Sequence, residues 1–444
     1  MMSELKYREF YEETLKLPVF DAHTHVDAEH LAARGLHDIL LYHMIVTELY
    51  SAGCTDSERL SEEPTEAEIV SRIEKAIPYI PYIENTSCFW ICRRILKDLY
   101  GWEEKITLDN WRKLHRIIQD KYADPAWPRS IMAMANIKKL STEYWRRKDG
   151  RADGILEYAL EWAFFDRCQW KEQHDIALVE LEATWDKTSP GSPLPVTITG
   201  GIEIKRRIKT LEDVHNAMQH YCDLIPYDDI VCVNQNFSTD VHYRPVSADD
   251  MSEALKRRDT AGRTERDIYI CYLQEYLLTE LGKRRSRVVV PMGIAAEPLP
   301  FESGTKFRDE SVFEYARMVA RHPKIDFVAF IASAGHNQHF CTLSRELPNL
   351  YLIGYWWHNF FPSYISRIME ERLELLPINK NIGFFTDGYC LDWVYGKSIL
   401  IRRIMSDVLG RKIAEGYYTE TQALDIAAAL LKGTGEKVFR KGMN

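Results

Sequence analysis

The sequence predicts an α/β protein built as a (β/α)8, or TIM, barrel. Eight short apolar segments lack the polar alternation of a half-exposed strand, so we expect both faces of each strand to be buried. Helix-like segments alternate with the later strands, a pattern typical of a parallel sheet. The chain of 444 residues also exceeds the roughly 250 residues of a simple barrel, a fold that tolerates long insertions in its loops.

The predicted strands are spread along most of the chain. They are residues 19–25, 131–137, 155–165, 230–237, 288–295, 327–333, 351–357 and 382–387. The third segment has the weakest strand signal, because Glu157 and Glu161 are spaced as on one face of a helix. Helices are predicted between the later strands, at residues 211–224, 267–282, 311–321 and 363–376.

The surplus length is predicted to lie between the first two strands. Residues 36–128 contain helix-like stretches at 40–50, 66–76 and 109–122. We therefore expect a helical insertion subdomain after the first strand, over the mouth of the barrel. The whole chain, residues 1–444, is interpreted as one elaborated barrel, because its first and last strands must be neighbours in a closed sheet.

Charge and hydropathy narrow the classes of partner. The chain has 57 Lys and Arg against 66 Asp and Glu, a net charge of −9 that disfavours nucleic acid. The longest uncharged run, residues 347–366, is interrupted by Pro348 and Pro362, so a membrane span is not expected. The first residues lack the apolar core of a signal peptide, which makes the cytoplasm the default location. A small-molecule substrate is the expected partner, and a homo-oligomer is possible.

Two histidines carry the sharpest local signal. His23 and His25 end the first predicted strand, and residues two apart on a strand point to the same side. The C-terminal end of the strands is where barrel enzymes hold their active sites. Two imidazoles there can bind one divalent metal; a pair of hydrogen-bonded core histidines is the alternative.

A carboxylate at the other end of the chain favours the metal. The eighth predicted strand ends in Asp387, and strands one and eight are neighbours in a closed barrel. Burying an unpaired carboxylate is costly, whereas two imidazoles and a carboxylate around one cation neutralise one another. Zn²⁺ is the first choice, with Mn²⁺ or another divalent ion as alternatives. Taken alone, Asp387 could instead cap a helix.

These residues resemble the amidohydrolase superfamily, the metal-dependent hydrolase-like barrels, and within it the uronate isomerases. The matching segments are residues 20–25, His43 ahead of residues 51–53, residues 354–357 at the seventh strand, Thr386 with Asp387, and residues 402–405 with 409–410. The resemblance implies a metal-dependent aldose–ketose isomerase that acts on a glucuronate-like or galacturonate-like sugar acid and forms the 2-keto sugar acid.

The sequence also departs from the family pattern. The family has a histidine at the end of its fifth strand, where this chain has Met292 and Gly293. His336 or His339, after the sixth strand, could replace it. The family's arginine soon after the last-strand aspartate is absent here, since Asp387 is followed by Gly388 and Tyr389.

The resemblance also implies roles for site residues. His23, His25 and Asp387 would hold the metal. Asp387 or a metal-bound hydroxide would move the proton between carbon atoms, and His43 would assist at oxygen.

The substrate would need contacts of its own. Its carboxylate would be bound by Arg167, with Arg93 or Arg94 from the insertion as reserves. At the barrel mouth, Trp356 or Trp357 could stack on the sugar ring, and His358 could face the site.

Two other functions fit the same residues. The first is a metal-dependent hydrolase or decarboxylase acting on a carboxylated substrate, because one fold supports many reactions. The second is a sugar-acid binder that has lost turnover. Retention of the His-x-His motif together with Asp387 argues against the binder.

Overall fold

Eight parallel strands form the sheet at the centre of the molecule. The computed structural model describes residues 4–55, 64–147, 152, 154–161, 173–185, 204–285, 288–294, 308–356 and 360–440. The strands pair in sequence order, which confirms the predicted barrel class. They are β1 (Val19–Asp21), β2 (Ile137–Glu143), β3 (Leu156–Glu161), β4 (Ile230–Asn236), β5 (Val288–Ile294), β6 (Ile325–Ile331), β7 (Leu350–Ile353) and β8 (Asn381–Ile382).

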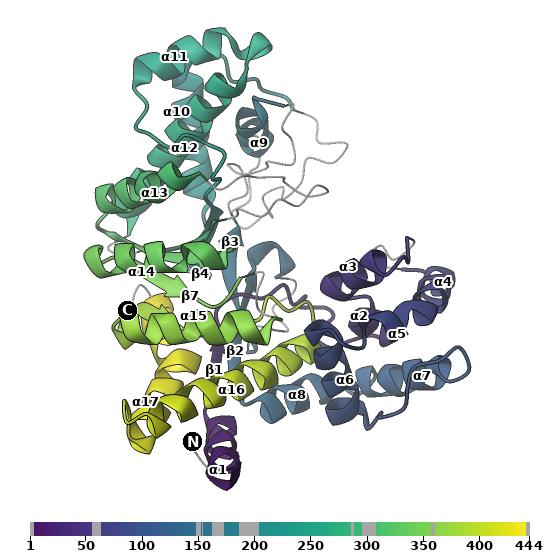
Figure 1. The fold of residues 1–444 in the computed structure, drawn as a ribbon. Helices are drawn as coiled ribbons and strands as arrows, with labels where there is room; N and C mark the ends of the chain where they lie inside the picture. Colours follow the sequence, from purple (N-terminus) through teal and green to yellow (C-terminus); the bar gives the residue numbers. More distant parts are fainter. Residues whose placement is uncertain are drawn as a thin grey trace.

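Helices surround the sheet (Figure 1). One helix, α1 (Glu4–Lys16), precedes β1. Those after β3 are α9 (Ile176–Trp185), α10 (Leu211–Leu224), α11 (Ala248–Lys256), α12 (Arg263–Arg284), α13 (Asp309–Arg321), α14 (Asn337–Glu346), α15 (Pro362–Leu375), α16 (Leu391–Ala414), α17 (Glu420–Ala428) and α18 (Thr434–Arg440). No helix in the described ranges is long and apolar enough to cross a membrane.

The first and last strands meet just beyond their carboxyl ends. The backbone N–H of Asp387 donates to the carbonyl of His23 at 3.0 Å, and the N–H of His25 donates to the carbonyl of Gly388 at 2.8 Å. These two hydrogen bonds join segments more than 360 residues apart in the sequence. The closure therefore occurs where the candidate metal ligands lie.

The inside of the barrel is filled by apolar side chains. Buried residues from β1, β3 to β8 and α18 form one cluster. At one end of it, Phe439 of α18 packs on Phe20 with ring centroids 5.9 Å apart. Phe330 and Phe385 of the same cluster contact His23, at 5.3 and 5.8 Å between ring centroids. The barrel is thus a packed core that supports the residues at its mouth.

The predicted second strand is wrong. Residues 131–135 belong to helix α8 (Trp127–Ala135), and the strand begins at Ile137. Pro128 lies in the first turn of α8, where its missing N–H has no cost, and Asn136 ends the helix with a left-handed φ of 50°. The apolar run was helical rather than extended because its residues Ile131, Met132 and Ala135 are buried along one helix face. The third segment is a strand, so its helical alternative is excluded.

In the described residues between β1 and β2, 22–55 and 64–136, the structure has seven α-helices. They are α2 (Leu36–Leu40), α3 (His43–Ser51), α4 (Glu66–Ala76), α5 (Ile80–Ile83), α6 (Ser87–Tyr100), α7 (Trp111–Tyr122) and α8. Figure 1 shows α3 to α7 projecting to one side of the strands. This helical stretch continues to Ala135, beyond the predicted end at residue 128. Its description as a separate subdomain of a single-barrel chain stays a prediction.

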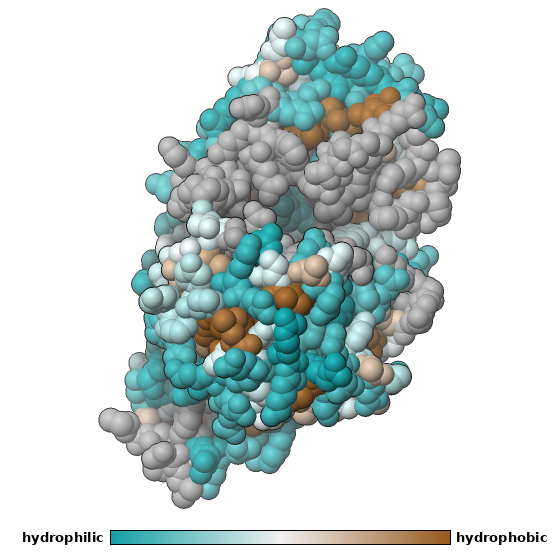
Figure 2. Space-filling view, turned by 90° about the vertical axis from the view of Figure 1, so that its right-hand side faces the viewer, coloured by the Kyte–Doolittle hydropathy of each residue, from teal (hydrophilic) through white to brown (hydrophobic). Residues whose placement is uncertain are grey.

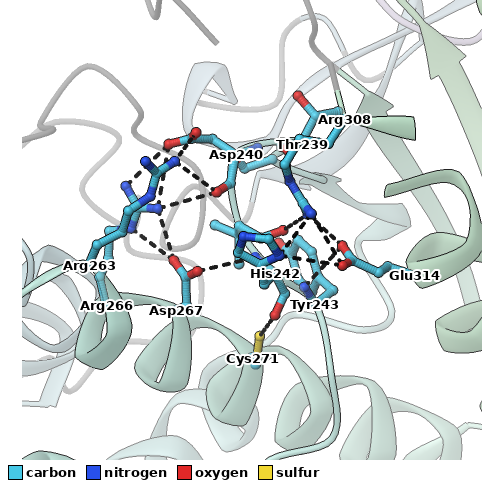
Figure 3. Close-up of polar contacts among 12 residues, drawn as sticks. Thr239, Asp240, His242, Tyr243, Arg263, Arg266, Asp267, Cys271, Arg308 and Glu314 are labelled. Atoms are coloured by element: carbon cyan, nitrogen blue, oxygen red, sulfur yellow. Dashed lines mark hydrogen bonds and ion pairs between the residues drawn. The ribbon is translucent and has the colours of Figure 1, made fainter. Parts of the chain in front are cut away.

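Arginines fix the loop that follows β4 at the barrel mouth (Figure 3). Arg308 donates to the carbonyls of Thr239 and Val241, at 2.8 and 2.7 Å, and pairs with Glu314 at 2.7 Å. On the other side of the loop, Arg263 and Arg266 approach Asp240. The loop therefore has a fixed conformation, and these arginines are already engaged by acids and carbonyls.

Candidate metal centre

His23 and His25 lie just past the end of β1, on the extended segment that continues the strand. Thr24 between them is tied to β2, since its N–H donates to the carbonyl of Ser141 at 2.7 Å. Asp21, the last residue of β1, accepts from the N–H of Thr386 at 3.0 Å and from its hydroxyl at 2.5 Å. The segment is thus held between β2 and the chain that follows β8, and both histidines face that chain.

Asp387 meets the two histidines as predicted. Its Oδ1 lies 3.4 Å from His23 Nε2 and 3.0 Å from His25 Nε2. The three side chains are 15–18% exposed, so they line a site open to a ligand while remaining largely buried. Asp387 has a left-handed φ of 57°, which turns the chain sharply after β8. Among the described residues, these three form the group of side chains that could hold a metal ion.

The spacing of the three ligand atoms suits a divalent ion. In a tetrahedral zinc site with bonds of 2.0–2.1 Å, ligand atoms lie about 3.3 Å apart. The observed separations of 3.4 and 3.0 Å from the Asp387 oxygen match that value. Burial would raise the pKa of Asp387, but hydrogen bonds from His23 and His25 outweigh it and hold the pKa well below its usual value. The carboxylate is therefore ionised, as a metal ligand must be.

Glu143, at the end of β2, orients His25. Its Oε1 contacts His25 Nδ1, which leaves Nε2 directed at Asp387. The other oxygen, Oε2, accepts from Arg146 Nε at 2.7 Å and from the Thr142 hydroxyl at 3.2 Å. Although burial would lower the pKa of His25, the charge of Glu143 raises it. A carboxylate on the far nitrogen of a ligand histidine is the usual outer-shell arrangement of metal sites.

We expect Glu143→Gln to weaken metal binding. The amide keeps the shape of the side chain but removes the charge that fixes the tautomer and basicity of His25. Loss of such a partner typically reduces metal affinity by about 10- to 100-fold. Competition with a chromophoric chelator measures the change, and Glu157→Gln on β3 is the matched control, since Glu157 pairs with Lys139 instead. Equal affinities of Glu143→Gln and the unmodified protein would show that Glu143 does not support the ligand.

Tyr42 and Lys397 bind the backbone carbonyl of Asp387. The Tyr42 hydroxyl donates to the Asp387 carbonyl at 2.7 Å, and Lys397 Nζ donates to the Tyr42 oxygen at 3.0 Å. Lys397 also reaches the carbonyls of Thr386 and Asp387. Burial lowers the pKa of this lysine to about 8. Both residues therefore stabilise the turn that presents the Asp387 carboxylate.

His43 lies near the metal ligands but does not belong to the group. It begins α3, and its ring centroid is 5.4 Å from that of Tyr389. The same Tyr389 ring stacks on His25 at 4.8 Å. Tyr389 thus contacts both His25 and His43, so one aromatic ring links His43 to a candidate metal ligand. Its catalytic role stays a prediction.

The predicted substrate contacts are only partly described. Trp356 packs against the barrel-interior cluster, and its ring lies with Asn236 over Gly293 at the end of β5. A Cβ at Gly293 would be 2.9 Å from Asn236 Oδ1 and 3.0 Å from the Trp356 ring. The position where the resembled family has its fifth-strand histidine is thus too closely packed here for a side chain. Arg167, Trp357 and His358 lie outside the described residues.

The other candidates lie elsewhere in the described part of the chain. His336 ends a short 3-10 turn after β6, and His339 is exposed on α14. Neither belongs to the group that could hold a metal. Arg93 and Arg94, the reserves for the substrate carboxylate, line a cavity on the inserted helices whose walls contain none of the metal-site residues.

Comparison with known proteins matches the whole chain to one fold. No protein-family model matches the sequence, and no curated protein sequence matches it. Among solved structures, a uronate isomerase from Thermotoga maritima is similar over 99% of this chain and 98% of its own, with a TM-score of 0.73 and 13% identity. A glucuronate isomerase from Caulobacter crescentus is similar over 99% and 94%, with a TM-score of 0.74 and 15% identity. The chain has the uronate isomerase fold.

A neighbour with a different description shares this fold. A Lactobacillus casei protein, assigned provisionally to the metal-dependent hydrolases, is similar over 97% of both chains with a TM-score of 0.60 and 12% identity. At such identities the uronate isomerase fold is established for this chain, whereas its reaction must be argued from the site.

Proposed function

We propose that this protein is a metal-dependent aldose–ketose isomerase that converts a uronic acid, such as glucuronate or galacturonate, into the 2-keto sugar acid. The main support is the convergence of His23, His25 and Asp387 in ligand geometry at the mouth of a barrel with the uronate isomerase fold. Two imidazole nitrogens and a carboxylate oxygen favour Zn²⁺, with Mn²⁺ as the alternative.

Different residues of the site can carry out the different steps of an isomerase reaction. When bound, the metal would polarise the substrate carbonyl and stabilise negative charge on its oxygen. Both histidines approach Oδ1 of Asp387, and its other oxygen is available to move the proton between C2 and C1. His43, across the Tyr389 ring, is the candidate for proton transfer at the substrate oxygen.

Substrate recognition would use residues other than the metal ligands. Trp356 presents an aromatic ring next to Asn236, which suits a sugar ring that has one apolar face and several hydroxyls. Arg167 remains the candidate for the substrate carboxylate, because a guanidinium binds a carboxylate through two parallel hydrogen bonds.

The proposal predicts a specific product. Protein stripped with a chelator and reloaded with Zn²⁺ or Mn²⁺ should convert glucuronate or galacturonate to the ketouronate. In D₂O, NMR should show deuterium entering C2 of the aldose when the abstracted proton exchanges with solvent. The stripped protein is the control and should be inactive.

Two other outcomes would contradict the isomerase assignment. Hydrolysed or decarboxylated product without ketouronate would favour the hydrolase class to which the Lactobacillus casei neighbour is assigned. Saturable binding of the uronate without any turnover would favour a sugar-acid binder.

A further inference from the structure

A cavity lies in the inserted helices, outside the metal centre. It has a volume of about 600 Å³ and is bounded by α5, α6 and the segment of residues 102–108. Its walls include Ile77, Ile80, Phe89, Leu96 and Ile106, all of which are buried. Figure 2 shows apolar surface among polar residues on the side of the molecule from which these helices project. Its size falls within the range of small-molecule sites, roughly 300–1,000 Å³.

The outer wall of the cavity has a fixed shape. Helix α6 ends at Gly101, whose left-handed φ of 66° turns the chain back, and the N–H of Trp102 donates to the Leu96 carbonyl at 3.0 Å. Farther along, the Asn110 side chain donates to the Lys105 carbonyl at 2.8 Å and accepts from the Thr107 N–H at 2.8 Å. These hydrogen bonds fix the conformation of the loop at both ends, so the shape of the cavity beneath it is also fixed.

Among the cations that line the cavity in the described part of the chain, all but one arginine form an ion pair. Three of its cations have acidic partners: Lys97 with Glu103 at 2.8 Å, Lys105 with Glu84 at 3.1 Å, and Arg94 with Asp98 at 2.7 Å.

Arg93 is different. Within the described ranges it has no ion pair, although it lies on the same helix and lines the cavity. Arg93 is exposed and lines an apolar hollow, which suits the carboxylate of a ligand whose apolar body lies inside. Glu104, an exposed acid of the loop, also lines the cavity, so a cationic ligand is the competing possibility.

A buried donor adds a second polar feature. Trp102 lines the cavity and is 6% exposed, and its indole N–H has no acceptor among the described residues. A buried N–H without an acceptor is unfavourable. An acceptor oxygen on a bound molecule would remove that cost.

We propose that this cavity binds an amphipathic organic acid, with its carboxylate at Arg93 and its apolar body against Ile80, Phe89 and Leu96. The inference does not depend on the reaction at the metal centre. It assigns a second small-molecule site to the inserted helices, which the barrel chemistry does not require.

Decanoate tests the inference, with decanol and decyltrimethylammonium as matched ligands of different charge. Isothermal titration calorimetry below the micelle concentration should show saturable binding of decanoate, at least about tenfold tighter than decanol, because a charge-assisted hydrogen bond adds to apolar burial. Arg93→Gln should remove that advantage. Arg129→Gln, an exposed arginine of α8 that does not line the cavity, should bind decanoate like the unmodified protein.

Several results would overturn the assignment. They are no saturable binding of decanoate to the unmodified protein, tighter binding of the cationic ligand than of decanoate, and decanoate affinity unchanged in Arg93→Gln. Thermal unfolding of each variant shows that it is folded; since Arg93 is exposed, we expect no change in its midpoint.

Discussion

His23→Ala is expected to lose both the bound metal and the catalytic activity while remaining folded. His23 supplies one of the three ligand atoms, and the remaining pair, His25 and Asp387, cannot hold an ion in the same geometry. Removal of a direct ligand should exceed the roughly 10- to 100-fold effect of losing an outer-shell partner. We therefore expect a decrease in kcat/KM of at least about 1,000-fold. Elemental analysis after dialysis measures the metal, and circular dichroism confirms the fold.

A second histidine variant controls for this substitution. His339 is exposed on α14 and lies outside the candidate metal group. His339→Ala should retain full metal content and activity. If His23→Ala kept its metal, or if His339→Ala lost it, the ligand assignment would be wrong.

Arg402→Met is expected to have the largest effect on stability. Arg402 of α16 is 1% exposed and donates to three main-chain carbonyls: those of Thr14, Leu17 at 3.0 Å and Ala135 at 2.9 Å. It thereby joins α1 and α8 to α16. Methionine fills a similar volume but leaves these carbonyls without this donor, each at about 1–3 kcal/mol.

Part of that loss is offset, because removing the buried guanidinium also removes the cost of its desolvation. This cost is evident in the pKa of Arg402, which burial lowers to about 10. We expect the free energy of unfolding to fall by about 2–4 kcal/mol.

The neighbouring arginine provides the control. Arg403 is exposed on the same helix, so Arg403→Met should change the free energy of unfolding by less than about 0.5 kcal/mol. Urea denaturation of both variants, followed by circular dichroism, gives the comparison. Similar stabilities of the two variants would show that the carbonyl contacts of Arg402 do not stabilise the fold.

Local signals made much of the barrel predictable. Helices α4 and α10 have the bounds that were predicted for them, and the structure shows that Thr65 and Thr210 begin these helices with capping boxes. The ligand group was also predictable. A His-x-His motif at the end of the first strand and an aspartate after the last strand must meet in a closed barrel.

Other parts of the site depend on tertiary contacts that no local pattern shows. Glu143 was missed because the apolar run of α8 was interpreted as the second strand, which displaced the end of β2 from the barrel mouth. Lys397 lies in α16 and reaches the turn after β8 only through helix packing. The one sequence signal for Glu143 is its position as a polar residue at the end of a strand. That signal can be recognised only when β2 is placed at residues 137–143.

A crystal structure of the protein soaked in Zn²⁺ or Mn²⁺, with anomalous data collected at the metal edge, tests the central claim most directly. We predict one strong peak bonded to His23 Nε2, His25 Nε2 and an oxygen of Asp387, at about 2.0–2.2 Å for Zn²⁺. Glu143 should remain on His25 Nδ1, as it is here. A peak bonded to other residues, or no peak at these three side chains under saturating metal, would contradict the assignment.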